Sequence, residues 1–263
     1  SVSESITNIV TKELTREEIE DLTSKIMNPL PAGCEPYGPN ADYMAERLPN
    51  INRADISRFL VARKGNVAAA TEMAEKCAEW RASVFPINKE DLRAAVETGC
   101  FFPYKTARDG TPCVYMRGGL YDNKKATPEQ FVLAAAYAIE YSLRTHPDQI
   151  NVSVVVDTVI IPGAPNLGAD MTFIKLFVKA LSDNFPERLK RIVMYPFPWY
   201  GRAIWSVVKV FVDKRTQDKA LLIGDSGKRE IPPELAKFVD PDNIPECCAG
   251  NCKDPIPDLL ATL

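Results

Sequence analysis

The stretch of residues 184–224 constrains the fold most strongly, because it contains a helix that is apolar on nearly every side. Residues 191–195 (RIVMY) are typical of a short strand, which Pro196 and Pro198 are expected to end. Residues 201–213 follow with helical spacing and few polar positions. A helix of this kind must be covered by a core, a lid, a partner, a ligand or a membrane surface.

The first third of the chain has helical patterns only. Thr15 and Glu18 form a capping-box pattern that starts a helix ending near residue 27, and the loop at residues 28–39 is rich in proline and glycine. Apolar residues then recur at helical spacing. We expect further helices at residues 42–48, 55–64, 67–81 and 89–97.

Strands and helices alternate in the rest of the chain, which indicates a mainly parallel sheet with right-handed crossovers. We therefore predict an α/β fold with an N-terminal helical bundle in residues 1–86, an α/β domain in residues 87–250 and a tail in residues 251–263. The strands are expected at residues 113–116, 152–161, 191–195 and 220–223. The helices are expected from Thr127 onward and at residues 171–181, 201–213 and 233–238.

Composition narrows the function without deciding it. The formal net charge of −3 gives no basic footprint for nucleic acid, so no nucleic-acid partner is expected. Seven scattered cysteines without a CxxC pair are typical of a reducing compartment. Cys247, Cys248 and Cys252 lack a second ligand pair, so we expect no zinc site.

No apolar run approaches the ~20 residues that cross a bilayer. We expect a cytoplasmic protein that associates peripherally with membranes.

The residues that common α/β enzymes need are missing. No strand precedes a G-x-G-x-x-G motif, and the pair Gly163 and Gly168 lacks the following Lys and Ser/Thr of a phosphate loop. The single histidine, His146, is expected at the end of a helix, which argues against histidine-dependent triads. Asp157 lies among valines and is interpreted as a structural aspartate of a core strand. We therefore expect no catalytic residues and no cofactor other than a bound lipid.

An ordered set of motifs between residues 51 and 252 resembles the CRAL-TRIO lipid-binding family, the secretory phosphatidylinositol transfer proteins. As a set, these motifs are more specific than any one of them alone. They are residues 59–64 (FLVARK), 66–70 (NVAAA), 77–81 (CAEWR), 109–112 (DGTP), 156–157 (VD), 184–188 (NFPER), 205–213 (WSVVKVFVD), 216–219 (TQDK) and 240–245 (DPDNIP).

The resemblance implies a lipid cavity whose floor is the sheet and whose mobile gate is the helix at residues 201–213. The gate and acyl-chain contacts are expected at Ile204, Trp205, Val208, Phe211 and Val212. The headgroup of phosphatidylinositol is expected at Arg63, Lys64, Glu187, Thr216 and Lys219. Further cavity candidates are Tyr115, Tyr121, Ile174 and Phe177.

We expect a non-enzymatic protein that binds a phosphatidylinositol-like phospholipid and exchanges it at anionic membranes, to which Lys209, Lys214 and Arg215 would be attracted. The choline-lipid-binding members of the family that the motifs resemble carry hydroxyl residues and tyrosines where this chain has residues 159–164 (VIIPGA) and 101–103 (FFP). The resemblance therefore does not imply a choline-lipid site. Two other hypotheses remain: a carrier of a sterol, terpenoid or vitamin, and a lipid-sensing interaction module. Protein partners stay open.

Overall fold

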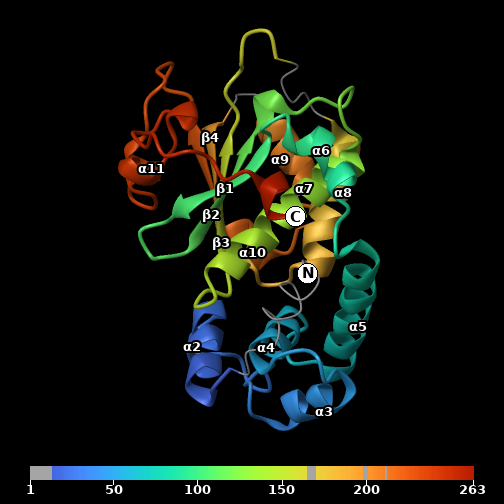
Figure 1. Cartoon of the computed structure of the whole chain (residues 1–263). Coiled ribbons are helices and arrows are strands. Elements are labelled where there is room, and N and C mark those ends of the chain that lie inside the picture. Colours follow the sequence, from blue (N-terminus) through green and yellow to red (C-terminus); the bar gives the residue numbers. More distant parts are fainter. Residues whose placement is uncertain (1–13, 165–169, 198–200, 211) are drawn as a thin grey trace.

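The computed structural model describes residues 14–164, 170–197, 201–210 and 212–263. Four helices form one end of the molecule, and a sheet covered on both faces forms the rest (Figure 1). This arrangement confirms the predicted α/β fold with an N-terminal helical part. The four helices are α2 (Arg16–Ile26), α3 (Pro39–Arg47), α4 (Arg53–Ala62) and α5 (Val67–Val84).

The predicted helix starts are confirmed where a side chain caps the first turn. Thr15 and Glu18 form the capping box of α2. Thr127 and Gln130 form a second capping box at α7 (Pro128–Thr145). Each box satisfies two backbone amides that the first turn would otherwise leave without a partner. His146 is the C-cap residue of α7, as expected.

The sheet has the order β1-β2-β3-β4-β5, and only its first pair of strands is antiparallel. Sequence reasoning missed β1, because Pro103 interrupts its apolar run; proline is tolerated here since β1 is an edge strand. The strands are β1 (Phe101–Thr106), β2 (Pro112–Arg117), β3 (Val152–Asp157), β4 (Leu189–Phe197) and β5 (Ala220–Gly224).

Each face of the sheet has its own cover. Phe101, Val114 and Val156 pack under α6 (Lys89–Val96), α7 and α8 (Met171–Asn184). Val155 and Val193 point to the other face. That face is covered by α11 (Pro233–Ala236) and by the 3₁₀ turns η2 (Pro241–Asn243) and η3 (Glu246–Cys248). The last turn, η4 (Leu259–Thr262), returns to α6.

Three predicted boundaries were wrong. β3 ends at Asp157 rather than at residue 161. β4 continues through Pro196, because the ladder to β5 is irregular there and needs no amide from the proline. The apolar helix, α9 (Gly201–Val208), stops before residue 213, and Asp213 instead caps the short α10 (Lys214–Asp218). None of the helices in the described part of the chain is long and apolar enough to cross a membrane.

Candidate functional site

Glu187, Arg215 and Lys219 meet at one end of the sheet and are called the charged trio here. The Glu187 carboxylate lies 3.2 Å from Lys219 Nζ and 3.3 Å from Arg215 Nη2. All three side chains are largely shielded, with 12% of Glu187 and 18% of Lys219 exposed. Two cations share one carboxylate, so the trio keeps a positive charge that an anion can neutralise.

The environment of Lys219 favours an added anion. Burial lowers the pKa of Lys219, although the adjacent Glu187 carboxylate acts in the opposite direction. A phosphate oxygen near Nζ would stabilise the ammonium form further. The trio is therefore suited to bind an anionic group.

Arg215 lies on α10 and Lys219 is its C-cap residue. The two are four residues apart, so they lie on the same side of this short helix. Asp213 caps this helix, and the Thr216 hydroxyl donates to its Oδ2 at 2.6 Å. The Thr216 oxygen therefore remains free to accept a hydrogen bond. Arg215 Nη2 also donates to the carbonyl of Ile26 at 3.1 Å, which ties α10 to the end of α2.

Arg63 and Lys64 lie on the turn between α4 and α5, and both are exposed. The backbone of Lys64 is left-handed (φ 53°). No hydrogen bond or ion pair joins either residue to the charged trio. The loop that contains Ala32 and Cys34 is near both groups of residues. On one side it contacts the α4–α5 turn, since a Cβ on Gly65 would lie 3.1 Å from the carbonyl oxygen of Ala32. On the other side, Arg215 acts electrostatically on the Cys34 thiol. Of the predicted headgroup residues, the structure therefore joins Glu187 and Lys219 by an ion pair and places Thr216 on the helix that Lys219 caps.

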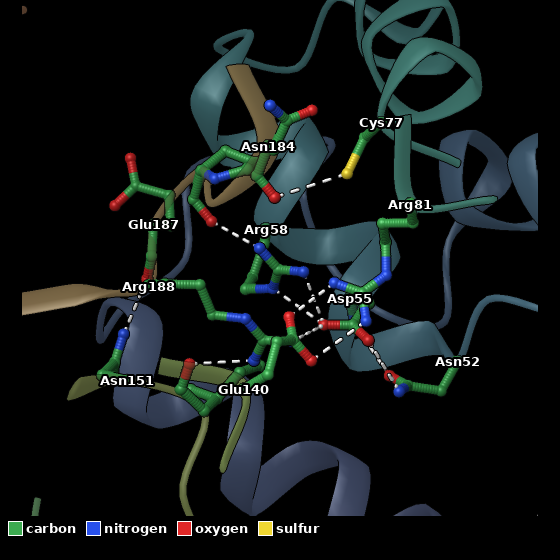
Figure 2. Close-up of polar contacts among 12 residues, drawn as sticks. Asn52, Asp55, Arg58, Cys77, Arg81, Glu140, Asn151, Asn184, Glu187 and Arg188 are labelled. Carbon is green, nitrogen blue, oxygen red and sulfur yellow. Dashed lines mark hydrogen bonds and ion pairs between the residues drawn. The ribbon is translucent and has the colours of Figure 1, made fainter. Parts of the chain in front are cut away.

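A cluster of ion pairs beneath the trio holds the loop that presents Glu187 (Figure 2). Asp55 Oδ1 lies 2.7 Å from Arg58 Nη2 and 2.8 Å from Arg188 Nη2. Burial opposes ionisation of Asp55, but the guanidinium groups of Arg188 and Arg58 outweigh it and hold the pKa of this carboxyl well below its usual value. The Glu187 carboxylate points away from this cluster.

The same cluster fixes the backbone of the loop. Arg58 Nη1 donates to the carbonyl of Pro186 at 2.5 Å, and Arg188 Nη1 donates to that of Ile150 at 2.9 Å. Asn151 Nδ2 donates to the carbonyl of Glu187 at 2.7 Å. Glu187 has a left-handed backbone (φ 57°), a conformation that these bonds support.

Four apolar side chains on strands β3, β4 and β5 share the face that carries α8 and are only half-buried. We call Val154, Ile192, Met194 and Leu222 the apolar floor. The floor adjoins the charged trio, since the amide of Ile192 donates to the carbonyl of Lys219 at 3.1 Å. Sequence reasoning missed these residues because both faces of the strands are apolar, so the pattern did not show which face is the less covered.

α9 packs against α8 and covers part of the same side of the sheet. Of the predicted gate residues, Trp205, Val208 and Val212 are half-buried. Ile204 lies within α9, and Phe211 falls outside the described residues. The turn after α9 is tethered to α10, since Gln217 Nε2 donates to the carbonyls of Lys209 (2.8 Å) and Val212 (2.7 Å).

The other cavity candidates separate onto two faces of the sheet. Ile174 and Phe177 are half-buried on α8, on the same side as the apolar floor. Tyr121 is buried between Phe131 and Phe173, and its hydroxyl donates to Asp170. Tyr115 is buried on the opposite face, against the C-terminal segments, because neighbouring residues of β2 alternate.

One sequence interpretation needs revision at the site, and another agrees with the structure. Arg215 was grouped with membrane-facing cations, whereas its side chain is 29% exposed and pairs with Glu187. The four-residue spacing between Arg215 and Lys219 is the sequence signal that could have grouped Arg215 with the predicted headgroup residues. Asp157 is structural, as expected, and forms a bidentate pair with Arg229 (2.7 and 3.1 Å).

The cysteines of the described chain are all free. Cys247 and Cys248 have their sulfur atoms 3.9 Å apart, and a hydrogen bond from Cys248 lowers the pKa of Cys247 to about 7. Among the described residues, no group of three or more His, Cys, Asp or Glu side chains could hold a metal ion.

Residues 96–250 match the CRAL/TRIO domain family, and because this is more than half of the chain, the chain belongs to that family. The Sec14 cytosolic factor of Schizosaccharomyces pombe is 26% identical over 223 residues, which cover 78% of this chain and 77% of that protein. Patellin-6 of Arabidopsis thaliana is 26% identical over 212 residues, 74% of this chain but only 50% of that protein. The resemblance stated from the motifs is confirmed.

The fold also matches a solved structure, the crystal structure of Sfh5, and the match covers 95% of this chain and 96% of the Sfh5 chain. The TM-score is 0.56 at 14% identity, so this likeness concerns the fold alone. Family membership supports a lipid-binding function in general.

We expect Asp55→Asn to lower the free energy of unfolding at neutral pH by about 3 kcal/mol, because it leaves two shielded guanidinium groups without a carboxylate. The folded pKa of Asp55 lies below the unfolded value of about 4, so its contribution is present above that pH and is lost as the pH falls further. Urea denaturation should therefore show the difference from wild type shrinking between about pH 4 and pH 2.

The matched control is Asp183→Asn, which removes an exposed carboxylate paired with Lys179. It should change the stability by less than about 0.5 kcal/mol. An equally small effect of Asp55→Asn would contradict the structural role of the cluster.

Proposed function

We propose that the protein binds a phosphatidylinositol-like phospholipid, with its acyl chains on the apolar floor and its headgroup at the charged trio, and exchanges it at membranes. The half-burial of the apolar floor carries the proposal. Side chains in the middle of a sheet that has parallel strands are normally covered on both faces. Here the opposite face is covered, and the floor has an incomplete cover beside α8 and α9.

The energetics favour acyl chains as the missing cover. Each methylene group moved out of water contributes about 0.8 kcal/mol, so a diacyl lipid gains most in an enclosed apolar site. Trp205 and Val208 on α9, together with Ile174 and Phe177 on α8, offer half-buried apolar surface on the floor's side. A lipid between these helices and the floor would complete the core.

The charged trio supports an anionic inositol headgroup. Lys219 and Arg215 can bind the phosphodiester, while Glu187 and the Thr216 oxygen can accept hydrogen bonds from inositol hydroxyls. Arg63 and Lys64 would contribute from the α4–α5 turn across the Cys34 loop, as the family resemblance implies. We propose no catalytic step, since the site offers binding groups without a paired nucleophile and base.

Membrane contact is proposed at the turn after α9. Val210 is 76% exposed, and exposed Lys209 and Lys214 flank it. An apolar side chain between cations suits an anionic membrane surface, to which each nearby lysine adds about 1 kcal/mol of attraction. Contact there would act directly on α9.

We expect wild-type protein to transfer labelled phosphatidylinositol between vesicles and Lys64→Ala with Lys219→Ala to lose at least tenfold of that activity. Each removed cation takes away a charge-assisted hydrogen bond of about 1.5–3 kcal/mol. The fold should persist because Arg215 still pairs with Glu187.

Lys76→Ala is the matched control, since it removes an exposed lysine of α5 that pairs with Glu72. It should leave transfer unchanged. Wild-type protein that transfers no phosphatidylinositol, or a double variant as active as wild type, would refute the headgroup assignment.

We expect Gln217→Leu to speed lipid exchange severalfold, because it removes both hydrogen bonds that tether the turn after α9 to α10. Each bond contributes about 1 kcal/mol. Stopped-flow transfer of fluorescent phosphatidylinositol measures the rate, with Gln149→Leu as the control away from the gate. An unchanged or slower rate for Gln217→Leu would contradict gating by this turn.

A further inference from the structure

Arg117 ends strand β2 on the sheet face opposite the apolar floor, next to Asp157 in the register and close enough to Cys247 to act on its thiol. Its Nε is buried and has no hydrogen-bond partner. In the parallel register it lies beside Asp157, but that carboxylate is already bound by Arg229. Among the described residues, the Arg117 guanidinium forms no hydrogen bond and no ion pair. A shielded arginine of this kind is rarely left without an anion.

An open pocket of about 510 Å³ lies beside Arg117, between α6, the edge strand β1 and the C-terminal residues 256–260. Phe101 and Phe102 form its buried apolar part, and Ile256, which is 41% exposed, lies on the C-terminal wall. The pocket lies at the β1 edge of the sheet, whereas the apolar floor lies on β3, β4 and β5. Its Phe102 belongs to the core on the far face of the sheet, and its Phe101 stacks on Phe177 of α8 with ring centroids 5.8 Å apart.

Among the described residues of the pocket wall, Arg117 and Lys89 are the cations that form no ion pair. Arg93 is also in the wall, but it pairs with Glu90 at 2.6 Å and with Glu97 at 3.5 Å. The Asp258 carboxylate accepts from the amides of Leu260 and Ala261 in η4. Exposed Lys89 adds a second positive charge to the wall.

We infer that this pocket is a second ligand site, which binds a small amphipathic anion through Arg117. The anionic head would be a carboxylate or a phosphate monoester, since both accept paired hydrogen bonds from a guanidinium. The apolar body would lie against Phe102 and Ile256. The volume falls within the range of about 300–1,000 Å³ that is usual for small-molecule sites.

The test uses dodecanoate, dodecyl phosphate and dodecanol as probes in calorimetric titrations of the full chain. Arg117→Met keeps the length of the side chain and removes the charge. It should bind the anion at least tenfold more weakly than wild type, with the alcohol unaffected. The two anions distinguish a carboxylate head from a phosphate head, and preference for either one supports the inference.

Location is measured separately, because an anion with an acyl chain can also enter the proposed phospholipid site. A dodecanoate probe that carries a photoreactive diazirine should label peptides within residues 89–117 or 256–263. Labelling confined to residues 171–212, equal anion binding by Arg117→Met, or no anion binding by wild type would each overturn the inference.

A second variant, at an exposed residue, tests the pocket in case Arg117→Met does not fold. Ile256→Glu changes an exposed residue of the pocket wall and places a carboxylate against the proposed apolar body of the anion, so it should also weaken anion binding at least tenfold. Arg16→Met, on exposed α2 at the other end of the molecule, is the control for removal of an arginine. Unchanged binding by Ile256→Glu would count against the site.

Discussion

The bonds of Asp55 to two arginines join the helical end of the molecule to the sheet. Arg58 comes from the same helix as Asp55, whereas Arg188 comes from the loop before β4. Arg81 of α5 and Glu140 of α7 form a neighbouring bidentate pair between the same two parts. Shielded ion pairs add little when compared with apolar packing, but the loss of one partner is severe. The cluster therefore specifies one docking geometry more than it adds stability.

That geometry determines where the proposed lipid head can lie. Arg58 holds the loop at Pro186, and Arg188 anchors the loop to the carbonyl of Ile150 before β3. Glu187 therefore turns outward from the cluster. Arg215 and Lys219 then meet its carboxylate at the ends of β4 and β5, where the apolar floor begins. Charged and apolar surfaces therefore adjoin, which is the arrangement that an amphipathic ligand requires.

Much of the fold could be predicted from local patterns, because capping boxes and β-branched runs act over a few residues. Thr15 and Thr127 marked two helix starts correctly, and every predicted strand is present. The long-range parts could not be read in this way. No pattern near Asp55 in the sequence indicates that it pairs with Arg188, which is 133 residues away. The residues of β2 are apolar on both faces, so the sequence did not indicate that Tyr115 faces away from α8. The helix from Gly201 cannot include Asp213, because Asp213 caps the next helix, and this cap is a local signal in the sequence.

The identity of the bound lipid tests the central claim most directly. Protein incubated with vesicles of phosphatidylinositol, phosphatidylcholine and a sterol can be recovered and measured by native mass spectrometry. We predict one phosphatidylinositol per chain, with its loss in the variant that lacks Lys64 and Lys219. Recovery of the sterol alone, or of protein without lipid, would contradict the account.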